Sequence, residues 1–163
     1  MINLREIKKK IITKNNIYWL FVISIIFFLD RYTKIFILNN FTENTYYLND
    51  YINLDLVWNI GIGFGFLSTE SNIIYNLITL IIASVIIFLL YIFIKSERMD
   101  KFIYALIIGG ALGNIYDRLI YKAVPDFVDI HYNNFHWFTF NVADIFISIG
   151  ITIFIMKSFF VKN

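Results

Sequence analysis

Carboxylates and amides stand inside stretches of this sequence that are otherwise apolar. The last such stretch begins FNVAD, so that Asn141 and Asp144 fall within one helical turn of each other. A carboxylate at the centre of a bilayer costs about 2.5–3.5 kcal/mol on insertion scales, and ionisable groups in membrane segments therefore mark functional sites. Such a group can transfer protons itself, or it can form an ion pair that joins helices.

Two other apolar stretches carry polar residues at helical spacing. Asp30 and Lys34 are four residues apart with the acid first, which is the favourable order for a pair. The third stretch places Asn114, Asp117 and Arg118 at i, i+3 and i+4, on one face of a helix. At a rise of about 1.5 Å per residue, these groups and the acid of the last stretch share one layer toward the outer face.

Acids outnumber bases in this layer. Arg31 and Asp129 are left out of the count, because their side chains are expected to point away. The acids and bases counted are Asp30, Asp117, Asp126 and Asp144 against Lys34 and Arg118. Excess carboxylates in a medium of low dielectric constant cannot all ionise, and one of a close pair keeps its proton. One carboxylate can then activate water while its protonated partner donates to a peptide carbonyl, as in aspartic proteases.

Structural ion pairs between helices are the competing interpretation of the layer. For Asp30, Lys34 and Asp117 the sequence favours the structural and the functional interpretation equally, whereas it favours a functional role for Asp126 and Asp144. Arg118 cannot act as a base. We therefore hypothesise that it pairs with a carboxylate or holds a substrate carbonyl.

Metal and cofactor chemistry finds little support in the sequence. His131 and His136 lack the HExxH spacing of zinc proteases, and the absence of cysteine removes thiolate ligands. A metal bound by carboxylates stays open, but nothing requires one, so we expect no metal and no cofactor. The glycines of IGIGFGF, residues 60–66, lack the Lys-Ser/Thr of a phosphate-binding loop, and they indicate a turn or a close backbone approach.

The composition predicts the elements that position these groups. The 163 residues are 59% hydrophobic and only 16% charged, against about 25% in a typical soluble domain, which predicts a single integral membrane domain. A spanning helix needs about 20 apolar residues, and four windows supply them, at about 17–38, 73–94, 102–121 and 140–160. We expect an all-α membrane protein with four transmembrane helices. The net charge of +2 gives no support for a nucleic-acid partner.

The distribution of Lys and Arg predicts the orientation. These residues gather in the N-terminal arm, at 95–101 and at the C-terminal end, whereas 39–72 has none. The positive-inside rule then places both termini in the cytoplasm and the outer loops 39–72 and 122–139 on the other side. Alternation in YYLNDYINLDLVWNI predicts short strands, and hence a small extracytoplasmic β-type cradle in the first outer loop.

Five motifs, taken in order, resemble those of the signal peptidase II family, the bacterial lipoprotein signal peptidases. They are DRYTK (30–34), NIGIGFG (59–65), GGALGNIYDRL (109–119), VPDFVD (124–129) and FNVAD (140–144). Two departures from the family pattern affect the site: Ile62-Gly63 replaces Ala-Ala, and Pro125 precedes the first acid of the pair where valine is usual.

The resemblance implies an aspartic endopeptidase of the bacterial plasma (inner) membrane. It would remove signal peptides from diacylglyceryl-modified prolipoproteins, cleaving before the lipidated cysteine, and would be inhibited by globomycin-type cyclic peptides. We expect a monomer in contact with membrane lipid, with its active site toward the extracytoplasmic face. By motif the catalytic pair is Asp126 and Asp144. The residues that would bind substrate or brace the site are Asp30, Lys34, Asn59, Gly61, Asn114, Asp117, Arg118 and Asn141.

Three other classes of membrane protein were weighed. Presenilin-type and prepilin-peptidase-type proteases carry a GxGD motif, which is absent from this sequence. A small carrier could use the acids as a proton relay, but four helices without an evident repeat make a poor transporter. A structural subunit would use the same residues as ion pairs between helices.

The predicted topology can be tested by labelling introduced thiols, since the chain has no cysteine of its own. In intact cells, Asn49→Cys and Asn133→Cys should react with a membrane-impermeant reagent, and Ser96→Cys should not, because Lys and Arg flank Ser96 on the cytoplasmic side. Reaction at Ser96→Cys in sealed cells would reverse the orientation.

Overall fold

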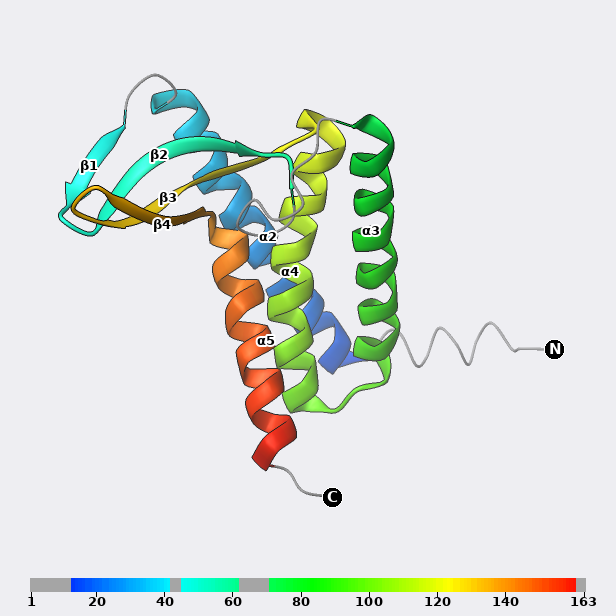
Figure 1. Cartoon of the computed structure of the whole chain (residues 1–163). Helices are drawn as coiled ribbons and strands as arrows, with labels where there is room; N and C mark the ends of the chain where they lie inside the picture. Colours follow the sequence, from blue (N-terminus) through cyan, green and yellow to red (C-terminus); the bar gives the residue numbers. More distant parts are fainter. Residues whose placement is uncertain (1–12, 42–44, 62–70, 161–163) are drawn as a thin grey trace.

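Four helices stand side by side, and a sheet lies across one end of them (Figure 1). The computed structural model describes residues 13–41, 45–61 and 71–160. In chain order the elements are α2 (Lys14–Asn40), β1 (Tyr46–Asn49), β2 (Ile52–Asn59), α3 (Asn72–Lys95), α4 (Arg98–Tyr121), β3 (Val124–Tyr132), β4 (Phe135–Phe140) and α5 (Val142–Phe160). The four apolar windows of the sequence fall on these helices, although the last helix begins at Val142 and not at residue 140.

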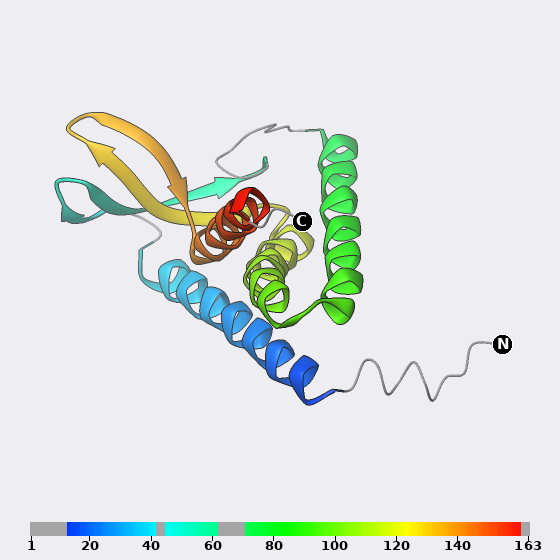
Figure 2. The ribbon, with the colours of Figure 1, turned by 90° about the horizontal axis from the view of Figure 1, so that it is seen from below.

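Helix α4 is the centre of the bundle and contacts each of the other three helices (Figure 2). Its glycines allow these contacts to be close, as small residues do between membrane helices. A Cβ atom on Gly109 would lie 2.8 Å from Cβ of Ile26 on α2, and one on Gly110 would lie 2.5 Å from the carbonyl oxygen of Ala143 on α5. At Gly113 a Cβ would overlap the carboxylate of Asp30. The backbone of α4 therefore approaches both α2 and α5 at the level of the polar layer.

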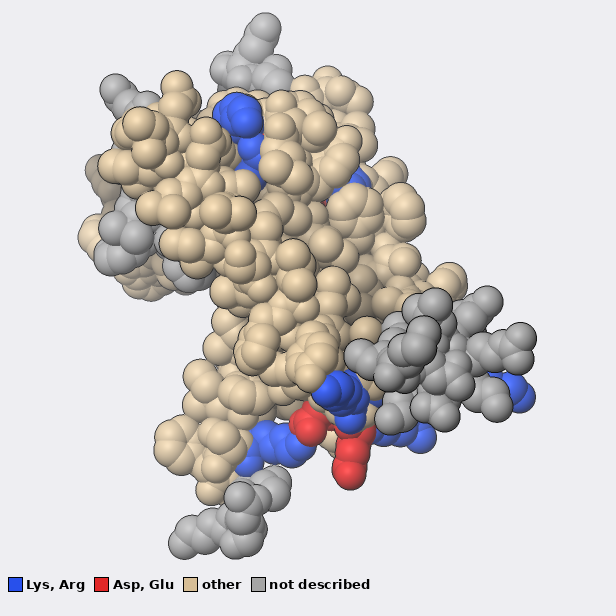
Figure 3. All heavy atoms as spheres, turned by 90° about the vertical axis from the view of Figure 1, so that its right-hand side faces the viewer, with Lys and Arg blue, Asp and Glu red and all other residues tan. Residues whose placement is uncertain are grey.

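Three of the described helices, α3, α4 and α5, are long and apolar enough to cross a membrane. Helix α2 is not among them, and it carries Asp30, Arg31 and Lys34 inside an otherwise apolar sequence. These three side chains are buried, whereas the exposed large residues between Ile17 and Phe36 are hydrophobic, for example Phe21 and Phe28. On the side of the molecule that shows α3, charged side chains gather mainly at the end where α3 turns into α4, and the middle carries almost none (Figure 3).

The sheet has the strand order β1-β2-β3-β4, and every neighbouring pair is antiparallel. Strands β1 and β2 lie in the segment 39–72, as predicted from its alternation. The sheet extends beyond the segment in which the cradle was predicted, because β3 and β4 form a hairpin that adds two further strands. Six of the nine residues of β3 are buried, so the strand lacks the period-two signal of a half-buried strand. Asn133, with a φ of 52°, supplies the left-handed residue of the hairpin turn.

Lys101 closes the other end of the bundle. Its buried ammonium group donates to the carbonyl oxygens of Phe93 (3.0 Å), Ile94 (3.2 Å) and Ser96 (2.6 Å). Carbonyls in the last turn of a helix lack their usual backbone donors, and here only that of Phe93 also accepts a described backbone N–H, from Ser96 at 3.3 Å. The lysine therefore satisfies them and fixes the turn into α4.

The close packing of α4 predicts that neither of two neighbouring glycines, Gly109 and Gly110, tolerates a methyl group. Ala in place of Gly gains about 1 kcal/mol of helix propensity, while overpacking costs about 1–3 kcal/mol. Gly110→Ala should lower the melting temperature in detergent, because the new methyl group meets the backbone of α5, which cannot move alone. Gly109→Ala should lower the melting temperature as well, because its methyl group would lie 2.8 Å from Cβ of Ile26, which side-chain rotation cannot move, and 3.2 Å from the carbonyl oxygen of Ile23. Ser84→Ala, at an exposed position of α3, is the control and should leave the melting temperature close to that of the wild type. Equal melting temperatures for wild type and Gly110→Ala would contradict the close approach of α4 and α5.

Candidate active site

Asp126 lies on β3, which follows α4 almost directly and pairs with β2. Its side chain is 2% exposed and accepts two amide hydrogen bonds. Asn59 Nδ2 donates to Oδ2 at 2.8 Å, and Asn141 Nδ2 donates to Oδ1 at 2.6 Å. Pro125, which has no N–H to donate, is fully buried in the same strand opposite Trp58 and does not interrupt β3.

Burial raises the pKa of Asp126 from its ordinary value to about 7, and the charge of Asp144 adds to the rise. The hydrogen bonds from Asn59 and Asn141 and the charge of Lys34 act in the opposite direction. This carboxyl group therefore exchanges its proton near neutral pH, in the range where an acid–base catalyst works best.

Asp144 is held by the start of α5. The backbone N–H of Asn141 donates to Asp144 Oδ2 at 3.2 Å, and the N–H of Asp144 donates back to Asn141 Oδ1 at 3.1 Å. This reciprocal pair is a capping box, which satisfies N–H groups at the beginning of a helix. Asp30 on α2 satisfies a further N–H group at the start of α5, since its Oδ1 accepts from the N–H of Ala143 at 3.0 Å. The capping role alone accounts for the spacing of Asn141 and Asp144.

Asn141 joins the two acids. It is fully buried, and because its Oδ1 is occupied by the N–H of Asp144, its Nδ2 is the group left to face Asp126. One side chain thus sets the position of one carboxylate through the helix cap and of the other through a direct hydrogen bond.

Asn114 and Lys34 position Asp144 from the other side. Lys34 Nζ donates to Asn114 Oδ1 at 2.8 Å, and this contact turns Asn114 Nδ2 toward Asp144 Oδ1, at 2.9 Å. Lys34 also lies 2.9 Å from Asp30 and 2.7 Å from Asp117, and all three of these side chains are fully buried. The lysine is therefore a shared partner of α2 and α4.

Arg31 belongs to this network, contrary to the expectation that it points away. Its guanidinium forms an ion pair with Asp117 and lies 4.7 Å from the centre of the Tyr116 ring. The i,i+3 spacing of Arg31 and Lys34 was the signal that could have found it. The arginine changes the charge count of the layer to four carboxylates against three cations, the cations being Arg31, Lys34 and Arg118.

Arg118 donates from Nη2 to the carbonyl oxygen of Gly61. Its Nη1 is buried without a hydrogen-bond partner, and the described part of the chain shows no ion pair between Arg118 and a carboxylate. Gly61 is held in turn by Asn59, whose Oδ1 accepts the N–H of Gly61 at 2.8 Å. The arginine therefore anchors the end of the segment that leads into residues 62–70, where Ile62-Gly63 lies outside the described residues.

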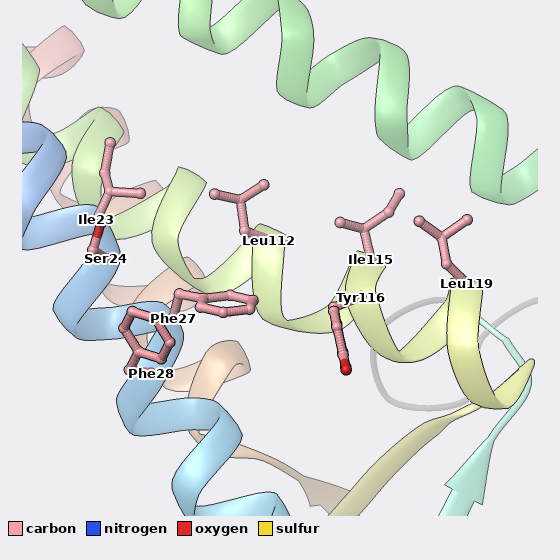
Figure 4. Close-up of a pocket in the computed structure, with 8 residues that line it drawn as sticks. All are labelled: Ile23, Ser24, Phe27, Phe28, Leu112, Ile115, Tyr116 and Leu119. Atoms are coloured by element: carbon pink, nitrogen blue, oxygen red, sulfur yellow. The ribbon is translucent and has the colours of Figure 1, made fainter.

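Both acids of the pair line one cavity of about 240 Å³. It is lined by Asn59, Ile82, Ala111, Asn114, Arg118, Val124, Asp126, Asp144 and Ile147. A larger cavity of about 420 Å³ lies between α2 and α4, but its lining has no ionisable acid or base apart from the Tyr116 phenol (Figure 4). Of these two cavities, only the smaller one is lined by carboxylates.

All ten residues that the sequence predicted for the site lie at this cavity or join it through the network. Five of them, Asn59, Asn114, Asn141, Asp126 and Asp144, are linked by direct hydrogen bonds. Asp30, Lys34 and Asp117 connect through Asn114, and Gly61 and Arg118 connect through Asn59. Their chemical roles stay predictions.

Comparison with known proteins places the chain in a family. The profile of the signal peptidase (SPase) II family matches residues 22–160. A lipoprotein signal peptidase of Pelagibacter ubique is 45% identical over 157 residues, which cover 94% of this chain and 95% of the relative. One from Blochmanniella pennsylvanica is 41% identical, covering 91% and 93%. A solved structure described as a bacterial membrane enzyme matches with a TM-score of 0.72 and 27% identity, covering 87% of each chain.

The matched segment contains all the elements from β1 to α5 and most of α2, and hence the whole network around the two acids. The chain therefore belongs to the signal peptidase II family.

Proposed function

We propose that this protein is an aspartic endopeptidase that removes the signal peptide from diacylglyceryl-modified prolipoproteins, cleaving before the lipidated cysteine. The observation that carries the proposal is the pair of carboxylates, Asp126 and Asp144, that line one cavity and are joined by Asn141. Among the described residues neither acid forms an ion pair, in contrast to Asp30 and Asp117. Family membership supports the class of reaction and of substrate.

In the proposed mechanism the pair shares one proton. The layer has four carboxylates and three cations, so one bound proton makes it neutral. The ionised carboxylate takes a proton from water as the oxygen attacks the peptide carbonyl carbon, and the protonated one donates to the carbonyl oxygen. When the intermediate collapses, a proton passes to the leaving amine and the C–N bond breaks. No metal or cofactor enters these steps.

Asn59, Asn114 and Asn141 hold the acids without adding charge. Each amide donates to a carboxylate from Nδ2, while its Oδ1 is fixed by a second donor. A lysine or arginine in their place would favour ionisation of both acids. The amides fix geometry and leave the shared proton in place.

We propose that all four helices span the bacterial plasma membrane, including α2. Its ionic side chains are paired and face the protein, so that its exposed surface is apolar, which agrees with the rule for charges in membrane segments. With the termini in the cytoplasm, the sheet and the cavity that contains Asp126 lie toward the extracytoplasmic face. That face is where a lipid-anchored substrate would present its scissile bond.

A structural role fits only part of the network. A closed set of ion pairs ties α2 to α4, and it consists of Asp30, Arg31, Lys34 and Asp117. These residues connect the two helices whether or not the protein is a protease. Asp126 and Asp144 form no ion pair among the described residues, so this role does not include them. Capping of α5 accounts for the position of Asp144, but it does not account for Asp126 or for the cavity that both acids line. The test below separates the two interpretations.

Asp126→Asn and Asp144→Asn should each reduce cleavage of a synthetic diacylglyceryl-modified prolipoprotein by at least about a hundredfold, since general acid–base catalysis contributes on that order or more. Both variants should remain folded, with melting temperatures in detergent close to that of the wild type. The measurement is turnover by purified protein, with Asp50→Asn as the matched control, because Asp50 is an exposed carboxylate in the β1–β2 turn. Substantial turnover by either variant would refute the assignment of the pair.

The pH dependence should show loss of activity on the alkaline side, centred near pH 7. The pKa of Asp126 is raised to about 7, so the protonated acid that the mechanism requires disappears as the pH rises through that value. Asn59→Ala removes a hydrogen bond that favours the charged carboxylate and should move the alkaline limb to higher pH.

The measurement is a pH–rate profile of kcat/KM on a substrate without ionisable groups near the cleaved bond. Asn76→Ala is the matched control, because Asn76 is an exposed amide on α3, and its profile should coincide with that of the wild type. Cleavage that increases from pH 7 to pH 9, or an unmoved limb in Asn59→Ala, would exclude Asp126 as the titrating acid.

A further inference from the structure

The β3–β4 hairpin carries a second cluster of chemically active side chains, away from the acid pair. Asp129 and His131 lie on β3, and His136 lies on β4 directly opposite His131. The carboxylate oxygen of Asp129 and one nitrogen of each histidine all lie within 4.8 Å of one another. Asp126 and Asp129 are three residues apart on one strand, so their side chains leave opposite faces of the sheet. The cluster is thus separate from the proposed catalytic cavity.

One nitrogen in this cluster is buried and has no hydrogen bond. His131 is 6% exposed, and its Nδ1 lies 3.4 Å from Asp129 Oδ2 without a hydrogen-bond partner among the described residues. His136 Nδ1 lies 2.7 Å from the same oxygen, and the two imidazole rings stack with their centres 5.3 Å apart. Two ring nitrogens therefore converge on one buried carboxylate oxygen, and one of them lacks a partner.

These distances suit a common metal ligand set. Ligands at 2.0–2.2 Å from a tetrahedral zinc ion lie about 3.3–3.5 Å apart, which matches the separation of His131 and Asp129. His136 Nδ1 lies closer to the carboxylate, at 2.7 Å, but the side chain is exposed, so its ring can move outward by the roughly 0.6–0.8 Å required. Imidazole and carboxylate are ligands that zinc and neighbouring divalent transition metals prefer.

We propose that Asp129, His131 and His136 form a binding site for a divalent transition metal of the zinc class. The three ligands come from both strands, so a bound ion would tie β3 to β4, with water completing the coordination on the exposed side of His136. The backbone supports the site, because the N–H of His131 donates to the carbonyl oxygen of Tyr51 at 2.9 Å. This inference does not rest on the proposed proteolytic function.

The test uses the full chain, purified in detergent without a histidine tag and titrated with Co²⁺ and then with Zn²⁺. The chain has two histidines and no cysteine, so a cobalt absorption spectrum with imidazole ligands can come only from His131 and His136. We expect one Co²⁺ per chain, displacement by Zn²⁺, and a rise in melting temperature when Zn²⁺ is added.

His136→Ala is the decisive variant, because His136 is exposed and its removal leaves the strands intact. It should weaken Co²⁺ binding at least tenfold and abolish the effect of Zn²⁺ on the melting temperature. Asn134→Ala, in the turn of the same hairpin, and Asp126→Asn, on the opposite face of the sheet, should bind as the wild type does. Absence of binding to the wild type would mean that the cluster is an ion pair between imidazole and carboxylate only. That result, unchanged binding by His136→Ala, or loss of binding by Asp126→Asn would each overturn the proposal.

Discussion

One buried ammonium group, Lys34 Nζ, sets the arrangement on which the site depends. It contacts Asp30, Asp117 and Asn114 at 2.7–2.9 Å, with no exposure to solvent. Removing one member of a buried ion pair costs about 3–5 kcal/mol, so the alignment of α2 against α4 is strongly constrained. The partners of Lys34 also position α5, because Asp30 caps its first turn and Asn114 donates to Asp144. Gly113 makes this geometry possible, since any side chain there would occupy the space of the Asp30 carboxylate.

The network divides into a part that is balanced in charge and a part that is not. Around Lys34 and Arg31 every carboxylate has a cationic partner. Around Asp126 and Asp144 the hydrogen-bond donors are amides. An amide orients a carboxylate but offers less stabilisation of its charge than a cation does, so a buried acid held in this way retains its proton to higher pH. The same helices thus provide a rigid ionic frame and, next to it, a pair of acids suited to proton transfer.

The sheet brings Asp126 to the cavity that Asp144 also lines. Asp144 belongs to a helix, whereas Asp126 is carried by β3, and Asn141 lies at the junction where β4 ends and α5 begins. Strand β3 is held on one side by β2, which supplies Asn59, and on the other by β4. The distance between the acids therefore depends on how the hairpin β3–β4 seats on the bundle. A metal ion on the outer face of that hairpin would stiffen the element that carries Asp126.

The sequence alone located the apolar windows, the polar residues inside them and the family, because these follow from local composition, helical spacing and ordered motifs. It also indicated β1 and β2, whose alternation is visible along the chain. Only the tertiary structure decided that β3 and β4 complete the sheet, since β3, most of whose residues are buried, loses the alternating pattern, and β4 is short and mostly exposed. It likewise decided that Arg31 pairs with Asp117, that Arg118 holds the carbonyl of Gly61, and that His131 and His136 converge on Asp129. Each of these contacts joins residues that lie apart in the sequence or on neighbouring strands, and spacing along one helix carries no information about the partner on another element.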